Sequence, residues 1–86
     1  MTRSQRIHHS LTQAFSPSVL EIIDDSDKHA GHAGARPGGE THYTVKIASA
    51  DFGGLTRVAM QRAVMHALQE EFDSGLHALS IKARSE

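Results

Sequence analysis

One long connection with few apolar residues constrains this chain more than any other feature. The run from His29 to His42 holds three histidines, four glycines and one proline. Together with the residues that precede it, this run forms a connecting segment, residues 24–41, between two strand-like runs. Connections longer than about 12–15 residues without structure of their own are usually functional or disordered. We interpret this segment as a working loop, and because little apolar area could hold it in place we expect it to be mobile in the isolated protein.

The bulk properties exclude several classes of protein. Eighty-six residues suffice for one domain with a modest core. No apolar run approaches the roughly 18 residues of a membrane span. With a formal net charge of −1, the chain also lacks the excess of basic residues that is typical of nucleic-acid-binding domains. Cysteine is absent, so any thiolate in a metal site must come from another molecule. These properties favour a cytoplasmic protein, with an organelle matrix as the alternative.

The hydrophobic periodicity predicts helices and strands in the order α-β-β-α-β. Apolar residues recur at helical spacing in two segments, and period-two alternation or a short β-branched run marks three others. We therefore expect helices over residues 3–15 and 55–72, and strands over residues 19–23, 42–47 and 76–83. The sequence thus predicts an α+β fold in which a three-stranded mixed sheet carries its helices on one face.

This order predicts where two stretches of histidines meet. The first two strands can pair as an antiparallel hairpin, whereas the helix between the second and third strands favours a parallel right-handed crossover. Strands two and three then begin at the edge of the sheet where the loop is attached. His77, at the start of the third strand, is expected to lie under the loop that carries His29 and His32, so imidazoles from separate segments converge.

Each of these histidines also has a plainer interpretation. His77 can be a rim residue that closes the apolar face of its strand, on which it is expected to lie with Leu79. His29 and His32 can be solvated loop residues, because two histidines three apart are a weak metal signal on their own. His42 fits a polar residue on the wet face of its strand that hydrogen-bonds the loop.

Four segments together resemble the BolA family. They are Asp-Asp-Ser-Asp-Lys-His-Ala-Gly-His at 24–32, Glu-Thr-His-Tyr at 40–43, Phe-Gly-Gly-Leu at 52–55 and Leu-His-Ala-Leu-Ser-Ile at 76–81. The resemblance covers nearly the whole chain and implies a single domain with a fold like the class II KH domain. It also implies a role in iron–sulfur cluster handling and iron homeostasis with a monothiol glutaredoxin. In that family a [2Fe–2S] cluster is shared with the glutaredoxin cysteine and glutathione, and the isolated chain does not bind it.

The resemblance assigns metal ligands to particular positions. His77 corresponds to the histidine at the start of the last strand, and His29 corresponds to the loop ligand, which places the chain in the histidine subtype. His32 is a possible substitute for His29. The chain departs from the family in the second helix, where Met60-Gln61-Arg62 replaces Arg-His-Arg, so only Arg62 matches.

A nucleic-acid-binding transcriptional regulator is the alternative function, with Arg57 and Arg62 as its contacts. KH domains clamp the nucleic-acid backbone with a Gly-x-x-Gly loop. The comparable turn here, Phe52-Gly53-Gly54-Leu55, lacks that spacing. An enzyme fits least well, because no nucleophile–base pair or paired carboxylate site stands out.

Overall fold

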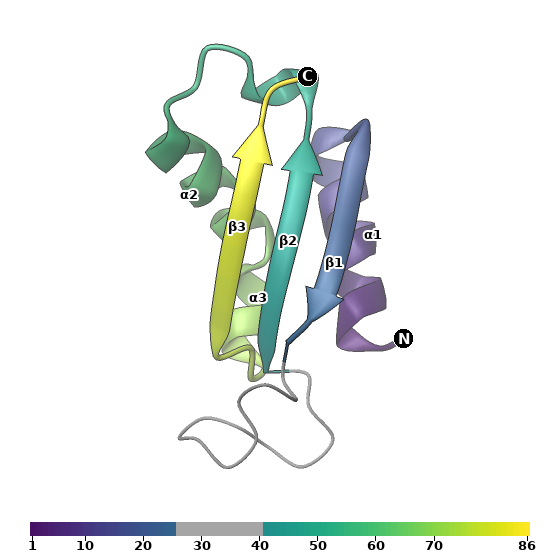
Figure 1. The fold of residues 1–86 in the computed structure, drawn as a ribbon. Coiled ribbons are helices and arrows are strands. Elements are labelled where there is room, and N and C mark those ends of the chain that lie inside the picture. Colours follow the sequence, from purple (N-terminus) through teal and green to yellow (C-terminus); the bar gives the residue numbers. More distant parts are fainter. Residues whose placement is uncertain (26–40) are drawn as a thin grey trace.

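The computed structural model describes residues 1–25 and 41–86, which form one sheet with its helices. Figure 1 shows the elements in chain order. They are α1 (Arg3–Phe15), β1 (Val19–Asp24), β2 (His42–Ala48), the 3₁₀ turn η2 (Ala50–Phe52), α2 (Arg57–Ala67), α3 (Gln69–Asp73) and β3 (Ala78–Arg84). Among the described residues, no helix is long and apolar enough to cross a membrane.

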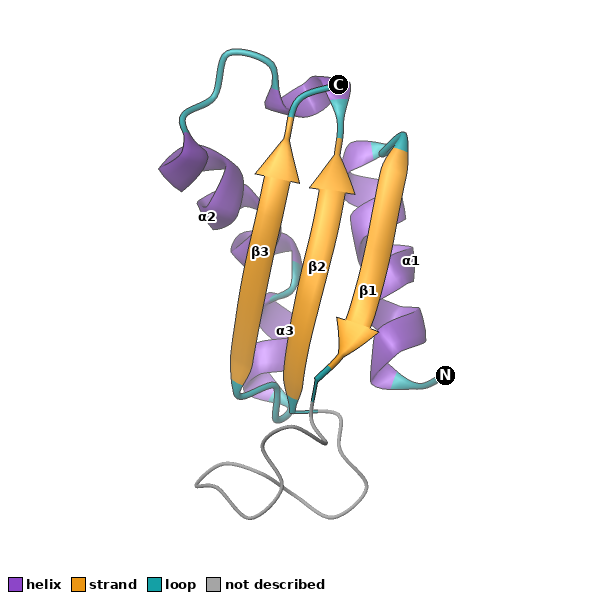
Figure 2. Ribbon diagram, viewed as in Figure 1, coloured by secondary structure: helices purple, strands orange, loops and turns teal. Residues whose placement is uncertain are grey.

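The sheet has the predicted mixed topology. The strand order is β1-β2-β3, with β1 antiparallel and β3 parallel to the central strand β2. Figures 1 and 2 show the helices gathered behind one face of the sheet, while the other face carries no helix. The α+β class, the mixed three-stranded sheet and its one-sided helical cover are therefore confirmed.

The core lies between the central strand and the helices. Tyr43, Val45 and Ile47 alternate along β2 and are buried, as the period-two pattern predicts. From the helical side, apolar residues of α1, η2 and α2 complete the cluster, chiefly Ile7, Leu11, Phe52 and Val64. A capping box at Thr2 and Gln5 begins α1, because the two side chains satisfy amide groups that have no partner within the helix.

The prediction of one helix over residues 55–72 is wrong in its extent. Thr56 is the N-cap of α2, since its side chain accepts a hydrogen bond from the amide of Ala59. The helix ends at Ala67 and α3 begins at Gln69, with Leu68 between them at φ −106° and ψ 16°. Leu68 is buried in the core. The apolar stripe continues through the break, so its periodicity could not reveal it.

The last strand starts two residues later than predicted. Residues 76 and 77 precede β3, which begins at Ala78. Leu76 is buried, whereas His77 is exposed. The prediction that His77 shares a strand face with Leu79 is therefore wrong, because the regular alternation begins only after His77.

A buried ion pair joins the first helix, α1, to the last helix, α3. Glu71, the polar residue within the apolar stripe, is 6% exposed and Arg3 is 7% exposed. Arg3 Nη1 lies 2.8 Å from Glu71 Oε1 and also donates to the hydroxyl of Ser74 at 2.9 Å. Arg6 adds a second contact, with its Nη2 3.1 Å from Glu71 Oε1. Charges of this kind are buried only when they are paired.

Candidate histidine site at the loop end of the sheet

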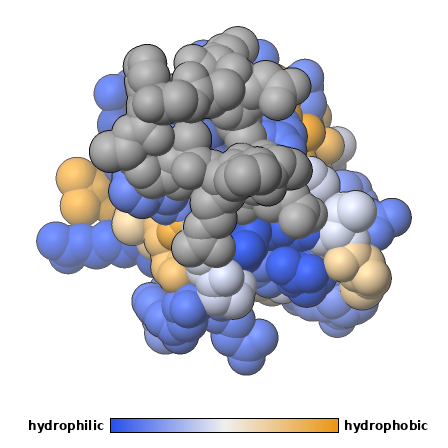
Figure 3. All heavy atoms as spheres, turned by 90° about the horizontal axis from the view of Figure 1, so that it is seen from below, coloured by the Kyte–Doolittle hydropathy of each residue, from blue (hydrophilic) through white to orange (hydrophobic). Residues whose placement is uncertain are grey.

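The histidine site lies at the end of the sheet where β1 finishes and β2 and β3 begin. Because β2 and β3 are parallel, both strands start at this end, which is the lower end in Figure 1. In Figure 3, which views the molecule from that side, the described surface around the grey residues is largely hydrophilic. We call this region the loop end.

Thr41 holds the backbone of His77 in place. The carbonyl oxygen of Thr41 accepts hydrogen bonds from the amide of His77 at 2.8 Å and from the amide of Ala78 at 3.1 Å. Thr41 is itself buried. The exposed ring of His77 therefore projects from a backbone anchored to the start of β2.

The rings of His42 and His77 are in contact. Their centroids are 5.2 Å apart and the ring planes make an angle of 52°. His42 is 7% exposed, and its Nδ1 lies 2.9 Å from Oγ1 of Thr41. One imidazole is thus buried and held by its neighbour, and it supports a second imidazole that faces solvent. We call these two residues the histidine pair.

Asp25 closes the β1–β2 hairpin next to the histidine pair. Its amide donates to the carbonyl of His42 at 2.8 Å, and its carboxylate accepts a hydrogen bond from the hydroxyl of Thr44. These bonds fix the points at which the chain leaves β1 and enters β2, and so fix where the intervening segment is attached.

The structure places one predicted ligand and leaves two untested. His77 lies at the loop end beside a parallel strand, as expected from the crossover rule, although its role as a ligand stays a prediction. His29, His32 and most of the 24–41 loop fall outside the described residues, so neither their position nor the expected mobility is tested. Within residues 1–25 and 41–86, no three histidine, cysteine or acidic side chains gather in a way that could hold a metal ion.

Sequence reasoning missed the part played by His42. Its position on the wet side of the alternating pattern predicted contact with solvent and loop. The contact follows from the parallel register of β2 and β3, in which His42 is the partner of Ala78. Ala78 is the residue directly after His77. Two histidines at the starts of adjacent parallel strands are brought together by that register.

The two arginines predicted for nucleic-acid binding lie in different surroundings. Arg57 lines a hollow beside β3 together with residues of all three strands, whereas Arg62 is exposed on α2 and is not among the lining residues. The structure therefore does not bring Arg57 and Arg62 into one site.

Comparison with known proteins agrees with this architecture. This chain is a small α+β domain with a three-stranded mixed sheet and a histidine pair at the loop end. Residues 11–86 match the model of the family described as BolA-like protein. The chain belongs to the BolA family.

Relatives and solved structures extend this match over almost the whole chain. An uncharacterised protein from Sinorhizobium sp. is 42% identical, over 95% of this chain and 89% of the relative. The chloroplastic protein BOLA1 of Arabidopsis thaliana is 46% identical, but this chain spans only 53% of it. The structure of the BolA domain of SufE1 from Arabidopsis thaliana superimposes with a TM-score of 0.89 at 41% identity, covering 99% of this chain and 93% of that one.

Proposed function

We propose that this chain is a partner of a monothiol glutaredoxin and supplies imidazole ligands to a [2Fe–2S] cluster that the two proteins share. The observation that carries the proposal is the placement of His77. Its ring is exposed at the loop end, its backbone is anchored to Thr41, and a second imidazole supports it. A ligand that is held in position before binding loses less entropy when the partner docks.

The ligand inventory requires a second molecule. A [2Fe–2S] cluster takes four ligands from protein or thiol groups, and this sequence contains no cysteine. In the proposal His77 and one loop histidine fill two positions, with His29 as the loop ligand and His32 as its possible substitute. The glutaredoxin cysteine and glutathione supply the two thiolates. Such mixed ligation resembles Rieske centres, in which histidine raises the reduction potential.

His42 serves in this proposal as a positioning residue rather than a ligand. Its ring is buried and its Nδ1 already lies at hydrogen-bonding distance from Thr41. The side of the ring packs against His77. His42 therefore limits the orientations open to the His77 ring without itself facing a docking partner.

The proposed role is transfer rather than catalysis. A cluster held between two proteins can pass to a third when they separate, which fits cluster assembly, trafficking and iron homeostasis. The absence of cysteine is compatible with the reducing cytoplasm, where we place this activity.

Coexpression with a monothiol glutaredoxin tests the proposal. The two proteins should copurify under anaerobic conditions as a coloured heterodimer, with the visible absorption of a [2Fe–2S] cluster and with bound glutathione. The proposal is contradicted if the glutaredoxin elutes alone with its full complement of cluster and this chain elutes colourless. The chain expressed without glutaredoxin is the control and should carry no cluster.

A further inference from the structure

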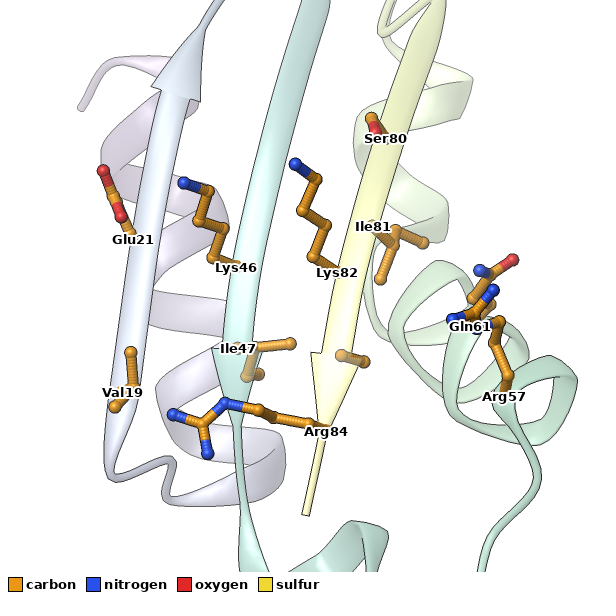
Figure 4. Close-up of a pocket in the computed structure, with 11 residues that line it drawn as sticks. Val19, Glu21, Lys46, Ile47, Arg57, Gln61, Ser80, Ile81, Lys82 and Arg84 are labelled. Carbon is orange, nitrogen blue, oxygen red and sulfur yellow. The ribbon is translucent and has the colours of Figure 1, made fainter. Parts of the chain in front are cut away.

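A cationic hollow lies on the helix-free side of the sheet and around the outer edge of β3. It is lined by Val19, Glu21, Lys46, Ile47, Arg57, Gln61, Ser80, Ile81, Lys82, Ala83 and Arg84. Figure 4 shows Lys46 and Lys82 rising from neighbouring strands on the same face, with Arg57 and Gln61 on α2 beyond the edge of β3. The histidine pair is not part of this lining.

The hollow concentrates positive charge in a chain that is slightly acidic as a whole. Four of the nine lysines and arginines line it, but only one of the ten acidic residues, Glu21. The formal net charge of the chain is −1. The hollow therefore favours a negatively charged partner.

The register of the sheet shows that the cations are not balanced within this face. Lys46 is the cross-strand partner of Glu21 on one side and of Lys82 on the other. Like charges placed directly opposite each other destabilise a sheet. Arg84, two residues beyond Lys82 on the same face, is opposite Ala48. An anionic group beside β3 would relieve this repulsion.

The outer edge of β3 can accept another strand. In the described part of the chain β3 is the last strand of the sheet and pairs only with β2. Backbone groups on an unpaired edge are a template for the addition of an extended peptide. The hollow extends round this edge, since Lys82 lines it from the outer face and Arg57 and Gln61 line it from α2.

We propose that an acidic, extended segment of a partner protein adds to β3 as a fourth strand. Alternate side chains of an added strand lie on the same face, so acidic residues spaced two apart would lie beside Ser80, Lys82 and Arg84. The intervening side chains would face the partly buried Ile81 and Ala83, which favours small apolar residues there. The recognised pattern is therefore acidic–apolar alternation.

A nucleic acid fits the hollow less well. Single strands are gripped by base stacking on aromatic side chains as well as by cations, and no aromatic residue lines the hollow. Base and phosphate groups also cannot complete a backbone ladder along β3. Only a polypeptide can form main-chain hydrogen bonds along the exposed edge of β3.

A labelled peptide tests this inference. The probe is an extended peptide of about ten residues, long enough to span a strand, that alternates glutamate and valine and carries fluorescein. Anisotropy should show saturable binding that weakens with salt. A glutamate–proline peptide of equal charge lacks an amide N–H at every second residue and is disfavoured as a strand, so it should bind at least about tenfold more weakly, and a lysine–valine peptide should not bind.

Paired charge reversals locate the site. Lys82→Glu should raise the Kd for the glutamate–valine peptide about tenfold, because it places like charges together. Arg62→Glu makes the same charge change on α2 outside the hollow and should alter the Kd by less than about twofold.

Four results would overturn the inference. They are absence of binding to the wild-type chain, equal binding of the proline peptide, tighter binding of a mixed single-stranded oligonucleotide with a steep salt dependence, and a self-association of the chain that Lys82→Glu abolishes. Each can occur whether or not a cluster is shared at the loop end, so the two proposals fail separately.

Discussion

Among single residues, His42 matters most for the proposed function, because its ring contacts the ring of His77. An exposed histidine on a strand end normally samples several rotamers. Here the buried ring of His42 occupies one side of His77, and the Thr41 carbonyl fixes the backbone below it. The His77 ring is therefore already restricted in the free protein, so it loses less conformational entropy when a partner binds.

Replacing His42 should weaken cluster binding without removing a ligand. We expect His42→Ala to shorten the lifetime of the shared cluster several-fold, because the His77 ring gains freedom. His42→Phe keeps an aromatic ring at that position and should restore most of the lifetime. Loss of visible absorbance from the purified heterodimer in the presence of a chelator measures this. A wild-type rate for His42→Ala, or an equally fast loss for His42→Phe, would contradict a positioning role.

The buried pair of Arg3 and Glu71 should dominate the stability of the helical layer. Glu71→Ala leaves the guanidinium of Arg3 buried without its carboxylate, which costs about 3–5 kcal/mol for buried pairs. Urea unfolding followed by far-ultraviolet circular dichroism measures the loss. Glu70→Ala is the matched control, because Glu70 is exposed, and should change stability by less than about 0.5 kcal/mol. Equal stabilities for the two variants would show that the pair contributes little.

At the scale of elements, the turn from α3 to β3 determines where His77 is presented. Gly75 has a φ of 130°, a conformation that side-chain-bearing residues rarely adopt. The next residue, Leu76, enters the core, and its amide donates to the carbonyl of Glu71 at 2.8 Å. The turn thus buries one residue and leaves the following one, His77, at the surface.

Shortening Leu76 should loosen this turn. Leu76 is 4% exposed, so Leu76→Ala is expected to cost about 2–4 kcal/mol through lost burial and an unfilled cavity. Leu55→Ala removes the same atoms at a site that is 41% exposed and should cost well under about 1 kcal/mol. Thermal unfolding of the two variants measures the difference. A smaller loss for Leu76→Ala than for Leu55→Ala would contradict this account of the turn.

The elements and their pairing were predictable because local patterns determined them. The alternation around Val45 identified the central strand, and the helix between β2 and β3 implied the parallel crossover that brings His77 to the loop end. What could not be predicted depends on tertiary contacts. The break at Leu68 leaves the apolar period intact, and the burial of Arg3 depends on Glu71, which is 68 residues away along the chain.

The candidate site was predictable only in part for the same reason. The predicted topology placed His77 at the loop end, and the family resemblance assigned it a role as a ligand. His42 was assigned to a wet strand face, and period-two patterning contains no information on which side chains of adjacent strands come into contact. The register between β2 and β3 supplied that information.

At the scale of the whole molecule, the two proposed surfaces lie on different parts of the sheet. The histidine pair lies where β2 and β3 begin, and the cationic hollow extends along β3 towards its end at Arg84. A glutaredoxin at the loop end and an acidic strand on β3 would contact separate sets of residues. The two proposals together therefore predict that the domain binds a glutaredoxin and a second protein at the same time.

Cluster sharing should depend on pH in one direction. An imidazole binds metal only in its neutral form, so protonation competes with the cluster. Assembly should therefore be complete in mildly alkaline solution and weaken as the pH falls between about 8 and 5, because protons compete with the metal for the imidazoles. Visible absorbance of the heterodimer across this range, with the glutaredoxin homodimer as the all-thiolate control, measures the effect. A heterodimer no more acid-sensitive than the homodimer would contradict histidine ligation.

Visible circular dichroism of the reconstituted heterodimer, recorded for histidine variants, tests whether His77 is a cluster ligand, with far-ultraviolet dichroism as the folding control. We predict that His77→Ala folds normally and abolishes the cluster spectrum. His29→Ala should weaken or alter that spectrum, and the double variant His29→Ala/His32→Ala should lose more than either single change. An unchanged cluster spectrum from a folded His77→Ala variant would contradict the assignment of His77 as a ligand.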